Sequence, residues 1–235
     1  MHIVQRHPWQ VSTAEAKKIQ LELAGEISRA GSVKVPHFIA GVDISVNRFK
    51  GKGTAAVVVL SYPQLDVVEV QTVSGSVTFP YVPGLLSFRE MPLILPAFEK
   101  LKVTPDLVMM DGQGFAHPRR IGIACHLGLF LGIPTIGCAK SRLIGTYNEP
   151  GSEHGRWSVL FDDIDVIGAV VRTKTRVTPV YVSTGHMITL NSAVDWVLAC
   201  CRGYRLPEPT RLAHMAAGGN LKKEIKQKDG KYSNP

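Results

Sequence analysis

The sequence has few cysteines, no long apolar run and a shortage of acidic side chains, and each of these excludes a class of protein. None of the four cysteines forms a C-x-x-C pair, the spacing that zinc and redox motifs use. No apolar run approaches the ~18–20 residues of a membrane-spanning helix, and the N-terminal residues lack the apolar core of a signal peptide. We therefore expect a cytoplasmic protein with buried, reduced thiols and no membrane segment.

The shortage of acidic residues leaves the chain basic, with 27 Lys and Arg against 19 Asp and Glu and a formal net charge of +8. A basic surface favours polyanionic partners, and nucleic acid is the first candidate. Charge alone does not decide this, because many proteins are mildly basic without binding nucleic acid. The length and the 45% hydrophobic content suit one domain, which we expect over residues 1–217. Residues 218–235 are lysine-rich without apolar periodicity, which predicts a flexible tail.

The order of the predicted elements indicates an α/β fold. Ser12 and Glu15 form a capping-box pattern that predicts a helix through Ala30. Three β-branched segments then predict an antiparallel meander, over residues 37–46, 54–62 and 66–77. The later predicted elements are a helix over 87–102, a strand over 106–112, a helix over 117–132, strands over 134–140, 166–172 and 179–183, a helix over 191–202 and a short helix from Pro207. Together they predict a mixed sheet flanked by helices, of which the ribonuclease H-like arrangement is one known form.

Two aspartates lie where the predicted strands should be buried. Asp43 is inside the apolar segment GVDIS, and Asp111 follows the apolar residues of VMMDGQG. Two carboxylates on adjacent buried strands repel each other unless a cation lies between them. Their oxygen ligands suit Mg²⁺ or Mn²⁺, so a divalent metal site explains both residues. Each aspartate taken alone could equally cap a turn at the end of its strand.

Glu90 follows Ser87 at the spacing of a second capping box, at the start of the predicted helix over 87–102. In that role Glu90 would serve only as the reciprocal partner of Ser87. If the start of the helix points toward the metal, Glu90 could ligate the ion directly or through water, and the positive helix end would favour a nearby phosphate. The spacing favours capping slightly, and both roles stay open.

The segment GQGFAH is similar to a dinucleotide-binding glycine loop, but His117 stands where the third glycine belongs. This difference removes the fingerprint of a Rossmann site. The segment offers a tight turn after a strand, followed by His117, Arg119 and Arg120 at the start of a predicted helix. These side chains could hold phosphate oxygens, or they could form an ordinary solvated basic helix end.

The segment FPYVPGLLSFRE is the most unusual local sequence, because Pro80 and Pro83 hold Tyr81 and Val82 in a stiff, extended loop. An apolar or aromatic side chain on a rigid loop can act as a wedge between stacked bases. Enzymes that detect altered bases must open the stack to read them. The alternative is a rigid connector with Tyr81 packed against the body of the protein.

Taken together, these stretches resemble the endonuclease V family of repair nucleases, which recognise deaminated purines, above all deoxyinosine. The resemblance runs from about Ile39 to His214, and its segments, in chain order, are GVDIS, PYVPGLLSFRE, PDLVMMDGQG, HPRRIGIACHLG, PTIGCAKSRL, STGH and GYRLPEPTRLAH. It implies a ribonuclease H-like fold and a Mg²⁺-dependent cut, with Mn²⁺ as a substitute. The cut would fall at the second phosphodiester bond on the 3′ side of the lesion and leave a 3′-hydroxyl and a 5′-phosphate. Uracil and xanthine are further candidate lesions.

The resemblance also implies roles for single residues. Asp43 and Asp111 match the family's metal ligands, and Glu90 matches the acidic residue beside them. Lys140 falls where the family has a lysine near the scissile phosphate, and His214 matches a further active-site position.

The same resemblance assigns the PYVP motif, residues 80–83, to the lesion wedge, with Tyr81 as the wedge residue. The residues expected to contact the flipped base or the phosphates are Gly112, Gly114, His117, Arg119, Arg120 and Arg142. One departure is Gln113, where bacterial relatives often carry histidine, and this puts the base contacts at that loop in doubt. At position 214 some members carry aspartate, so a strict requirement for imidazole is also in doubt.

Two other functions fit the sequence. A non-catalytic binder of altered nucleic acid could use the basic surface and the PYVP loop without a metal. A different nuclease of the ribonuclease H-like kind could act on inosine-bearing RNA or on branched DNA. We expect a monomer whose main partner is DNA with deaminated bases, and inosine-bearing RNA is the second candidate partner.

Overall fold

The structure is a computed structural model and describes residues 1, 3–47 and 51–221. Over these residues the chain forms eight strands, all in one sheet, and five helices. In chain order the elements are α1 (Thr13–Ala24), β1 (Phe38–Asn47), β2 (Lys52–Ser61), β3 (Val67–Ser76), α2 (Leu86–Glu99), β4 (Leu107–Met110), α3 (Ile123–Leu131), β5 (Thr135–Ala139), β6 (Trp157–Asp162), β7 (Asp165–Val171), β8 (Val180–His186), α4 (Leu190–Ala199) and α5 (Glu208–Ala217). None of these described helices is long and apolar enough to cross a membrane.

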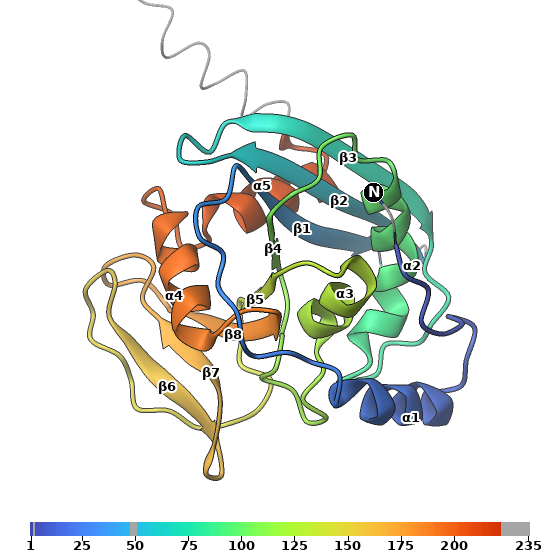
Figure 1. Ribbon diagram of the computed structural model, residues 1–235, viewed down its shortest axis with the longest axis horizontal. Coiled ribbons are helices and arrows are strands. Elements are labelled where there is room, and N and C mark those ends of the chain that lie inside the picture. The colour runs from blue at the N-terminus through green and yellow to red at the C-terminus, as the bar shows by residue number, and fades with distance from the viewer. Residues whose placement is uncertain (2, 48–50, 222–235) are drawn as a thin grey trace, which may run out of the picture.

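The sheet is mixed, with the strand order β3-β2-β1-β4-β5-β8-β7-β6. Strands β1, β2 and β3 form an antiparallel meander, and β4 pairs in parallel with both β1 and β5. Beyond β5 the sheet is antiparallel again, through β8, β7 and β6. Figure 1 shows the meander and the β6–β7 hairpin at opposite ends of the molecule. The predicted ribonuclease H-like sheet, a meander joined to parallel strands, is confirmed.

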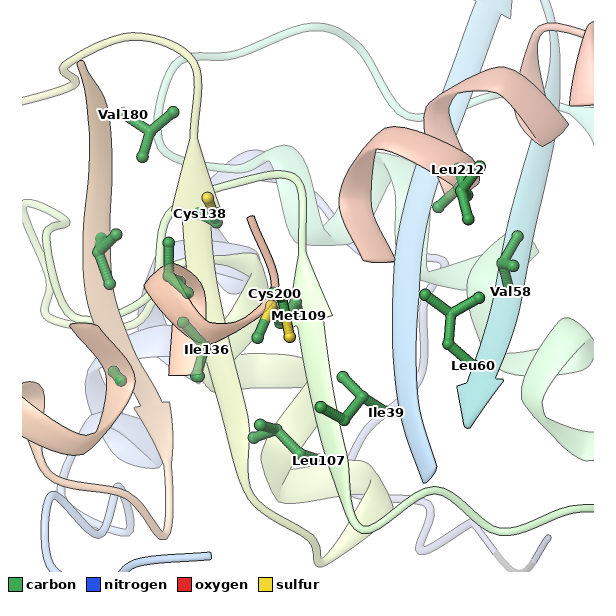
Figure 2. Close-up of a cluster of buried hydrophobic side chains, with 14 of the residues drawn as sticks. Ile39, Val58, Leu60, Leu107, Met109, Ile136, Cys138, Val180, Cys200 and Leu212 are labelled. Atoms are coloured by element: carbon green, nitrogen blue, oxygen red, sulfur yellow. The ribbon is translucent and has the colours of Figure 1, made fainter. Parts of the chain in front are cut away.

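Alternate residues of the central strands face two separate hydrophobic cores. In β1, Ile39 joins the core that contains α4 and α5, whereas Ala40 joins the core that contains α2 and α3. In β4, Leu107 and Val108 divide in the same way. Figure 2 shows side chains of the first core, including Leu212 of α5. Because side chains alternate along a strand, helices cover both faces of the sheet at its centre.

Helix α5 lies close against β1 because Gly41 has no side chain. A Cβ at Gly41 would lie 1.8 Å from the carbonyl oxygen of Pro209, in the first turn of α5, so a larger residue would push the helix away. Asp43 lies two residues farther along β1, on the same face as Gly41. The glycine of GVDIS therefore sets the distance between the strand of Asp43 and the helix that carries His214.

The first helix is shorter than predicted, although its capping box is confirmed. Helix α1 ends at Ala24 and does not continue to Ala30. The chain beyond it pairs with a distant segment, because the Ser28 carbonyl oxygen accepts a 2.8 Å hydrogen bond from the Met187 N–H. The Ser28 N–H donates in turn to His186 Nδ1 at 3.2 Å. These long-range bonds replace the helical bonds that the local pattern favours.

The helix predicted from His117 begins only at Ile123. Residues 117–122 form a loop, in which Arg120 has a φ of 57°. A right-handed helix does not allow this backbone conformation. The basic residues of this segment therefore lie on a loop before α3, and the predicted basic helix start is wrong.

Strand β6 is missing from the predicted elements. It is an edge strand in which only Leu160 is buried, so its segment shows no clear alternation of apolar and polar residues. The predicted strands over 166–172 and 179–183 correspond to β7 and β8. An edge strand of this kind forms through its hydrogen bonds to β7, which the local sequence does not reveal.

The predicted tail begins with four residues that pack against the body. The Gly218 N–H donates to the His214 carbonyl oxygen at 3.1 Å, and the Asn220 N–H donates to that of Met215 at 2.8 Å. Leu221 is buried in the core beside α5. The remainder of the predicted flexible tail, 222–235, lies outside the described residues.

A chain of hydrogen bonds attaches the N-terminal segment to α2 and α3. His7 Nδ1 lies 2.9 Å from the Pro8 carbonyl oxygen, and His7 Nε2 lies 2.7 Å from His126 Nε2. His126 Nδ1 lies 3.0 Å from the Ser87 hydroxyl. Burial lowers the pKa of both histidines, and a carbonyl oxygen only accepts. The neutral rings then allow one arrangement, in which Ser87 donates to His126, His126 to His7, and His7 to Pro8.

We expect the free energy of unfolding to fall as the pH drops below about 6.5, because His126 stays neutral when folded and takes up a proton when unfolded. Burial lowers the pKa of His126 from 6.5 to about 3. The contribution of His126 to the free energy of unfolding is therefore complete above pH 6.5. As the pH falls between these two values, it is lost at about 1.4 kcal/mol per pH unit. Urea unfolding at about pH 7.5 and about pH 5 measures this slope.

His126→Phe should make the pH dependence less steep by about that amount. His154→Phe is the control. His154 is exposed, so this substitution removes a histidine without changing the buried pair. An unchanged slope in His126→Phe would contradict the prediction.

Candidate active site

Four of the side chains singled out in the sequence meet at one edge of the sheet. Asp43 lies in β1, Asp111 directly follows β4, and Lys140 directly follows β5. Because β1, β4 and β5 are parallel neighbours, their carboxyl ends lie at the same edge. His214 reaches this edge from α5. Carboxyl ends of parallel strands are where sheets of this class place their ligands.

Two basic side chains partly offset the two aspartates. His214 Nδ1 lies 2.6 Å from Asp43 Oδ2, and Lys140 Nζ lies 4.0 Å from the same oxygen. The Lys140 ammonium also forms an ion pair with Asp111 Oδ2. Both aspartates are largely buried, whereas the His214 side chain is 59% exposed. A ligand can therefore reach the aspartates from the side of His214.

Glu90 lies inside α2 and does not cap it. The helix begins at Leu86, and its N-cap residue Leu85 makes no side-chain hydrogen bond. The Ser87 hydroxyl bonds to His126, so the predicted Ser87–Glu90 capping box is wrong. The helix starts one turn before Glu90, which leaves the carboxylate buried against the sheet edge.

The charge of Glu90 is coupled to that of the aspartates. Burial, followed by the charges of Asp43 and Asp111, raises the pKa of Glu90 to about 8. Burial and the charge of Asp43 also raise the pKa of Asp111, although Lys140 opposes this shift. Three carboxyl groups thus share one region with too little positive charge to ionise them all at neutral pH.

This donor set fits a divalent cation. One ligand atom from each of Asp43, Asp111 and His214 lies within 4.8 Å of the others. Carboxylate oxygens suit Mg²⁺ or Mn²⁺, and a cation here would relieve the repulsion that raises the pKa of Glu90. Glu90 does not belong to this group of three, and its role as a direct ligand stays a prediction.

A cavity of about 320 Å³ opens beside the carboxylates, and Asp111 and Lys140 form part of its wall. Its size lies in the range of small-molecule sites. Of the residues predicted for the wedge, the base pocket and the phosphate contacts, those that line it are Tyr81, Val82, Pro83, Gly112, His117 and Arg142. Those that do not line it are Pro80, Gly114, Arg119 and Arg120. Part of the predicted set therefore lines one cavity next to the carboxylates, and binding of a base in this cavity stays a prediction.

One carbonyl oxygen fixes the PYVP loop in place. The Gly84 oxygen accepts three hydrogen bonds, of 2.8–3.0 Å, from Gln20 Nε2, His117 Nε2 and Arg119 Nη2. Gly84 has a φ of 78°, and a Cβ there would lie 2.8 Å from the Arg119 guanidinium. Tyr81 extends from this anchored loop with 67% of its surface exposed, and it borders both the cavity and a second hollow beside α2.

The loop before α3 uses its basic residues for structure. Burial lowers the pKa of His117 to about 4, so the ring is neutral and donates from Nε2. Its Nδ1 accepts a 3.2 Å bond from the Arg119 N–H. Arg120 forms ion pairs with Asp162 at 2.8 Å and Asp165 at 3.1 Å. Contact of these three basic residues with phosphate stays a prediction.

Several cavity residues have no signal in the sequence. Gln20 comes from α1 and is almost fully buried, yet it lines the cavity and donates to the Gly84 oxygen. Ser141 and Leu143 follow Lys140 in the same wall, and the Gln113 amide donates to the Ser141 carbonyl oxygen at 2.8 Å. The capping and strand patterns that the sequence offers do not reach these residues, because only the fold brings them together.

The mixed sheet, the aspartates at its carboxyl edge, the adjacent lysine and the open cavity define a nuclease of the ribonuclease H-like class. The family model for endonuclease V matches residues 21–215. An endonuclease V of Dehalococcoides mccartyi is 53% identical over 215 residues, which cover 92% of this chain and 96% of that protein. The chain belongs to the endonuclease V family, whose general role is that of a DNA repair endonuclease.

Solved structures of the family superpose on this one. The endonuclease V of Bacillus subtilis matches with a TM-score of 0.89 and 30% identity, covering 97% of this chain and all of its own. The endonuclease V of Ciona intestinalis, in complex with a 23mer DNA containing an inosine followed by a ribo-adenosine, matches with a TM-score of 0.77. It is 30% identical and covers 91% of this chain and 99% of its own.

Replacing Lys140 with methionine should tighten Mn²⁺ binding in the absence of nucleic acid. The ammonium pairs with Asp111 and lies 4.0 Å from Asp43 Oδ2, so it competes with a cation for the same charges. Removing one charge at that distance is worth about 1 kcal/mol or more, which is about fivefold in the dissociation constant. Isothermal titration calorimetry measures this constant.

Arg142→Met is the matched control, because Arg142 belongs to the same loop but donates to the Gly145 carbonyl oxygen at 2.9 Å. It should leave Mn²⁺ binding close to that of the wild type. Unchanged or weaker binding in Lys140→Met would show that the ammonium does not compete with the ion.

Proposed function

We propose that this chain recognises a deaminated base in DNA, above all deoxyinosine, and hydrolyses the second phosphodiester bond on its 3′ side. The products would carry a 3′-hydroxyl and a 5′-phosphate. The observation that carries the proposal is the shared wall, since Asp111 and Lys140 belong both to the carboxylate cluster and to the cavity. A base held in the cavity would leave its own strand lying across the carboxylates.

Detection of the lesion would fall to the PYVP loop. Tyr81 is the exposed aromatic residue at the mouth of the cavity, and the three hydrogen bonds to the Gly84 oxygen hold its loop rigid. A rigid aromatic side chain can fill the gap that a flipped nucleotide leaves in the stack. A deaminated base pairs poorly, so it is easier to extrude than an intact one.

Cleavage would depend on the groups at the sheet edge. Mg²⁺, or Mn²⁺ in its place, would polarise the scissile phosphate and lower the pKa of an attacking water when bound by Asp43 and Asp111. The Lys140 ammonium, which can leave Asp111 once a cation is present, would offset the charge that grows on the phosphate oxygens. His214 orients Asp43 through their 2.6 Å contact. Arg142, exposed on the cavity rim, would hold the strand.

Inosine-bearing RNA is a second candidate substrate. The DNA in complex with the Ciona intestinalis relative carries a ribo-adenosine after its inosine. A panel of one sequence as DNA, as DNA with a single ribonucleotide 3′ to the inosine, and as RNA separates the two candidates. Branched DNA and a purely non-catalytic binder are the remaining alternatives, and adding a branched DNA without inosine to the panel, with Mg²⁺ present, tests both. A monomeric state and a cytoplasmic location remain predictions.

Asp111→Asn should reduce the nicking of inosine-containing DNA in Mg²⁺ by at least about a hundredfold, because it removes one charge from the proposed metal site. A gel assay with end-labelled duplex measures the rate, and circular dichroism checks the fold. Asp195→Asn is the matched control, since Asp195 is exposed on α4. Wild-type nicking by Asp111→Asn would overturn the proposed site.

Tyr81→Ala should lower the preference for inosine over adenine substrates by about tenfold, because the wedge ring contributes to detection and not to bond cleavage. Residual cutting at inosine should persist. Tyr81→Phe keeps the ring and should keep the preference, which separates the ring from the hydroxyl. The ratio of kcat/KM for the two substrates is the measurement, and a ratio unchanged by Tyr81→Ala would argue against the wedge.

A further inference from the structure

Tyr204 is an exposed aromatic residue with one face already covered. Its side chain is 47% exposed, in the loop between α4 and α5. The Arg211 guanidinium lies over the ring, 4.2 Å from its centroid. A cation on one face of a tyrosine leaves the other face for a second planar group. The segment GYRLPEPTRLAH contains both residues, and the proposed cleavage chemistry uses only its last position.

A buried ion pair holds the covered face rigid. Glu208 is 1% exposed and accepts two hydrogen bonds from Arg211, of 2.7 and 2.8 Å, and the Arg211 side chain is only 11% exposed. Arg211 also donates to the Met215 sulfur at 3.3 Å. Burying such a pair costs desolvation energy that its attraction does not always repay, so stability alone is a weak reason for it. Its effect here is to fix the plane against which Tyr204 lies.

This assembly lies next to the proposed catalytic groups. Arg205, the neighbour of Tyr204, donates to the Lys140 carbonyl oxygen at 2.6 Å and to that of Pro179 at 2.9 Å. Arg211 precedes His214 by three residues on α5, so both lie on one side of the helix, one turn or ~5 Å apart along its axis. The contacts of Arg205 and Arg211 therefore place Tyr204 beside the segment that carries Lys140 and on the side of α5 that carries His214.

The cavity and Tyr204 lie on opposite sides of these carboxylates. The cavity wall includes Ser87 of α2 and Ile123 of α3, which cover one face of the sheet. Tyr204 packs on α5, which covers the other face. A strand whose base occupies the cavity would cross the carboxylates at the sheet edge and then reach Tyr204. In the proposed reaction the cut lies 3′ to that base, so the strand reaches Tyr204 in the 3′ direction.

We infer that Tyr204, backed by Arg211 and Glu208, is a stacking platform for a nucleobase on the 3′ side of the scissile bond. The ligand class is a nucleotide of the substrate strand, recognised by the flat face of its base and not by its sequence. This inference rests on the proposed function for the direction of the strand. It adds a second binding point for the strand, beyond the cavity, and fixes the path of the phosphate between the two.

The test is an abasic scan. A set of fluorescent single strands, each with one inosine, carries one abasic nucleotide per strand. The abasic position differs from strand to strand and covers every position on both sides of the inosine. Fluorescence anisotropy in EDTA gives the dissociation constant for each strand with the wild type, Tyr204→Ala and Tyr204→Phe. Phe161→Ala is the matched control, because Phe161 is 40% exposed in β6 and is also an aromatic surface residue.

The wild type should lose about tenfold in affinity when the abasic nucleotide is one or two positions beyond the scissile bond, as expected for one lost stack. Tyr204→Ala should bind the strand without an abasic nucleotide about tenfold more weakly than the wild type does. An abasic nucleotide at those positions should not weaken its binding further. Tyr204→Phe and Phe161→Ala should keep the wild-type profile. An unchanged affinity in Tyr204→Ala, or an abasic profile that Tyr204→Ala leaves intact, would overturn the platform.

Cleavage of the parent strand by the wild type in Mg²⁺, measured in parallel, separates the two proposals. A wild type that does not cut this strand overturns the proposed function. The platform alone is overturned if the wild type cuts the strand but Tyr204→Ala binds it as tightly as the wild type does. The same holds if Tyr204→Ala changes the abasic profile only on the 5′ side of the inosine.

Discussion

Mutual repulsion between buried carboxylates is the constraint on which the rest of the structure depends. Asp43, Asp111 and Glu90 share one sheet edge, where burial and then the charges of the two aspartates raise the pKa of Glu90 to about 8. Lys140 and His214 offset only part of this charge. Such groups stay together on rigid strands when a proton or a cation neutralises part of their charge. The energetic cost of the assembly would therefore also be the source of the affinity for a metal ion that we propose.

The scaffold around this edge relies on close backbone approach and on carbonyl oxygens as anchor points. Gly41 lets α5 lie against β1, which brings His214 to Asp43. The Gly84 oxygen accepts hydrogen bonds from three side chains and so fixes the loop that carries Tyr81. Carbonyl oxygens do not move with side-chain rotamers, so a loop held in this way keeps the backbone of its aromatic residue beside the cavity.

Basic residues divide into two groups that net charge alone does not distinguish. His117, neutral and buried, and Arg119 support the PYVP loop, and Arg120 is tied to two aspartates near the β6–β7 hairpin. Lys140 and Arg142 border the cavity with part of their side chains exposed. The excess positive charge of the chain thus serves structure beside the PYVP loop and remains exposed at the rim of the cavity.

The sequence by itself determined the elements whose patterns are local: the meander, the strand, helix and strand predicted over 106–140, the proline-stiffened loop, and the positions of Asp43 and Asp111 on buried strands. It did not determine what Glu90, the loop at 117–122 or Gln20 would do. The Ser87–Glu90 spacing fits a capping box in any isolated helix, and only the contact of Ser87 with His126 and the earlier start at Leu86 turn Glu90 into a buried carboxylate. The tertiary structure decided these points because each depends on hydrogen bonds and charges between segments far apart in the chain, and periodicity within a segment carries no information about them.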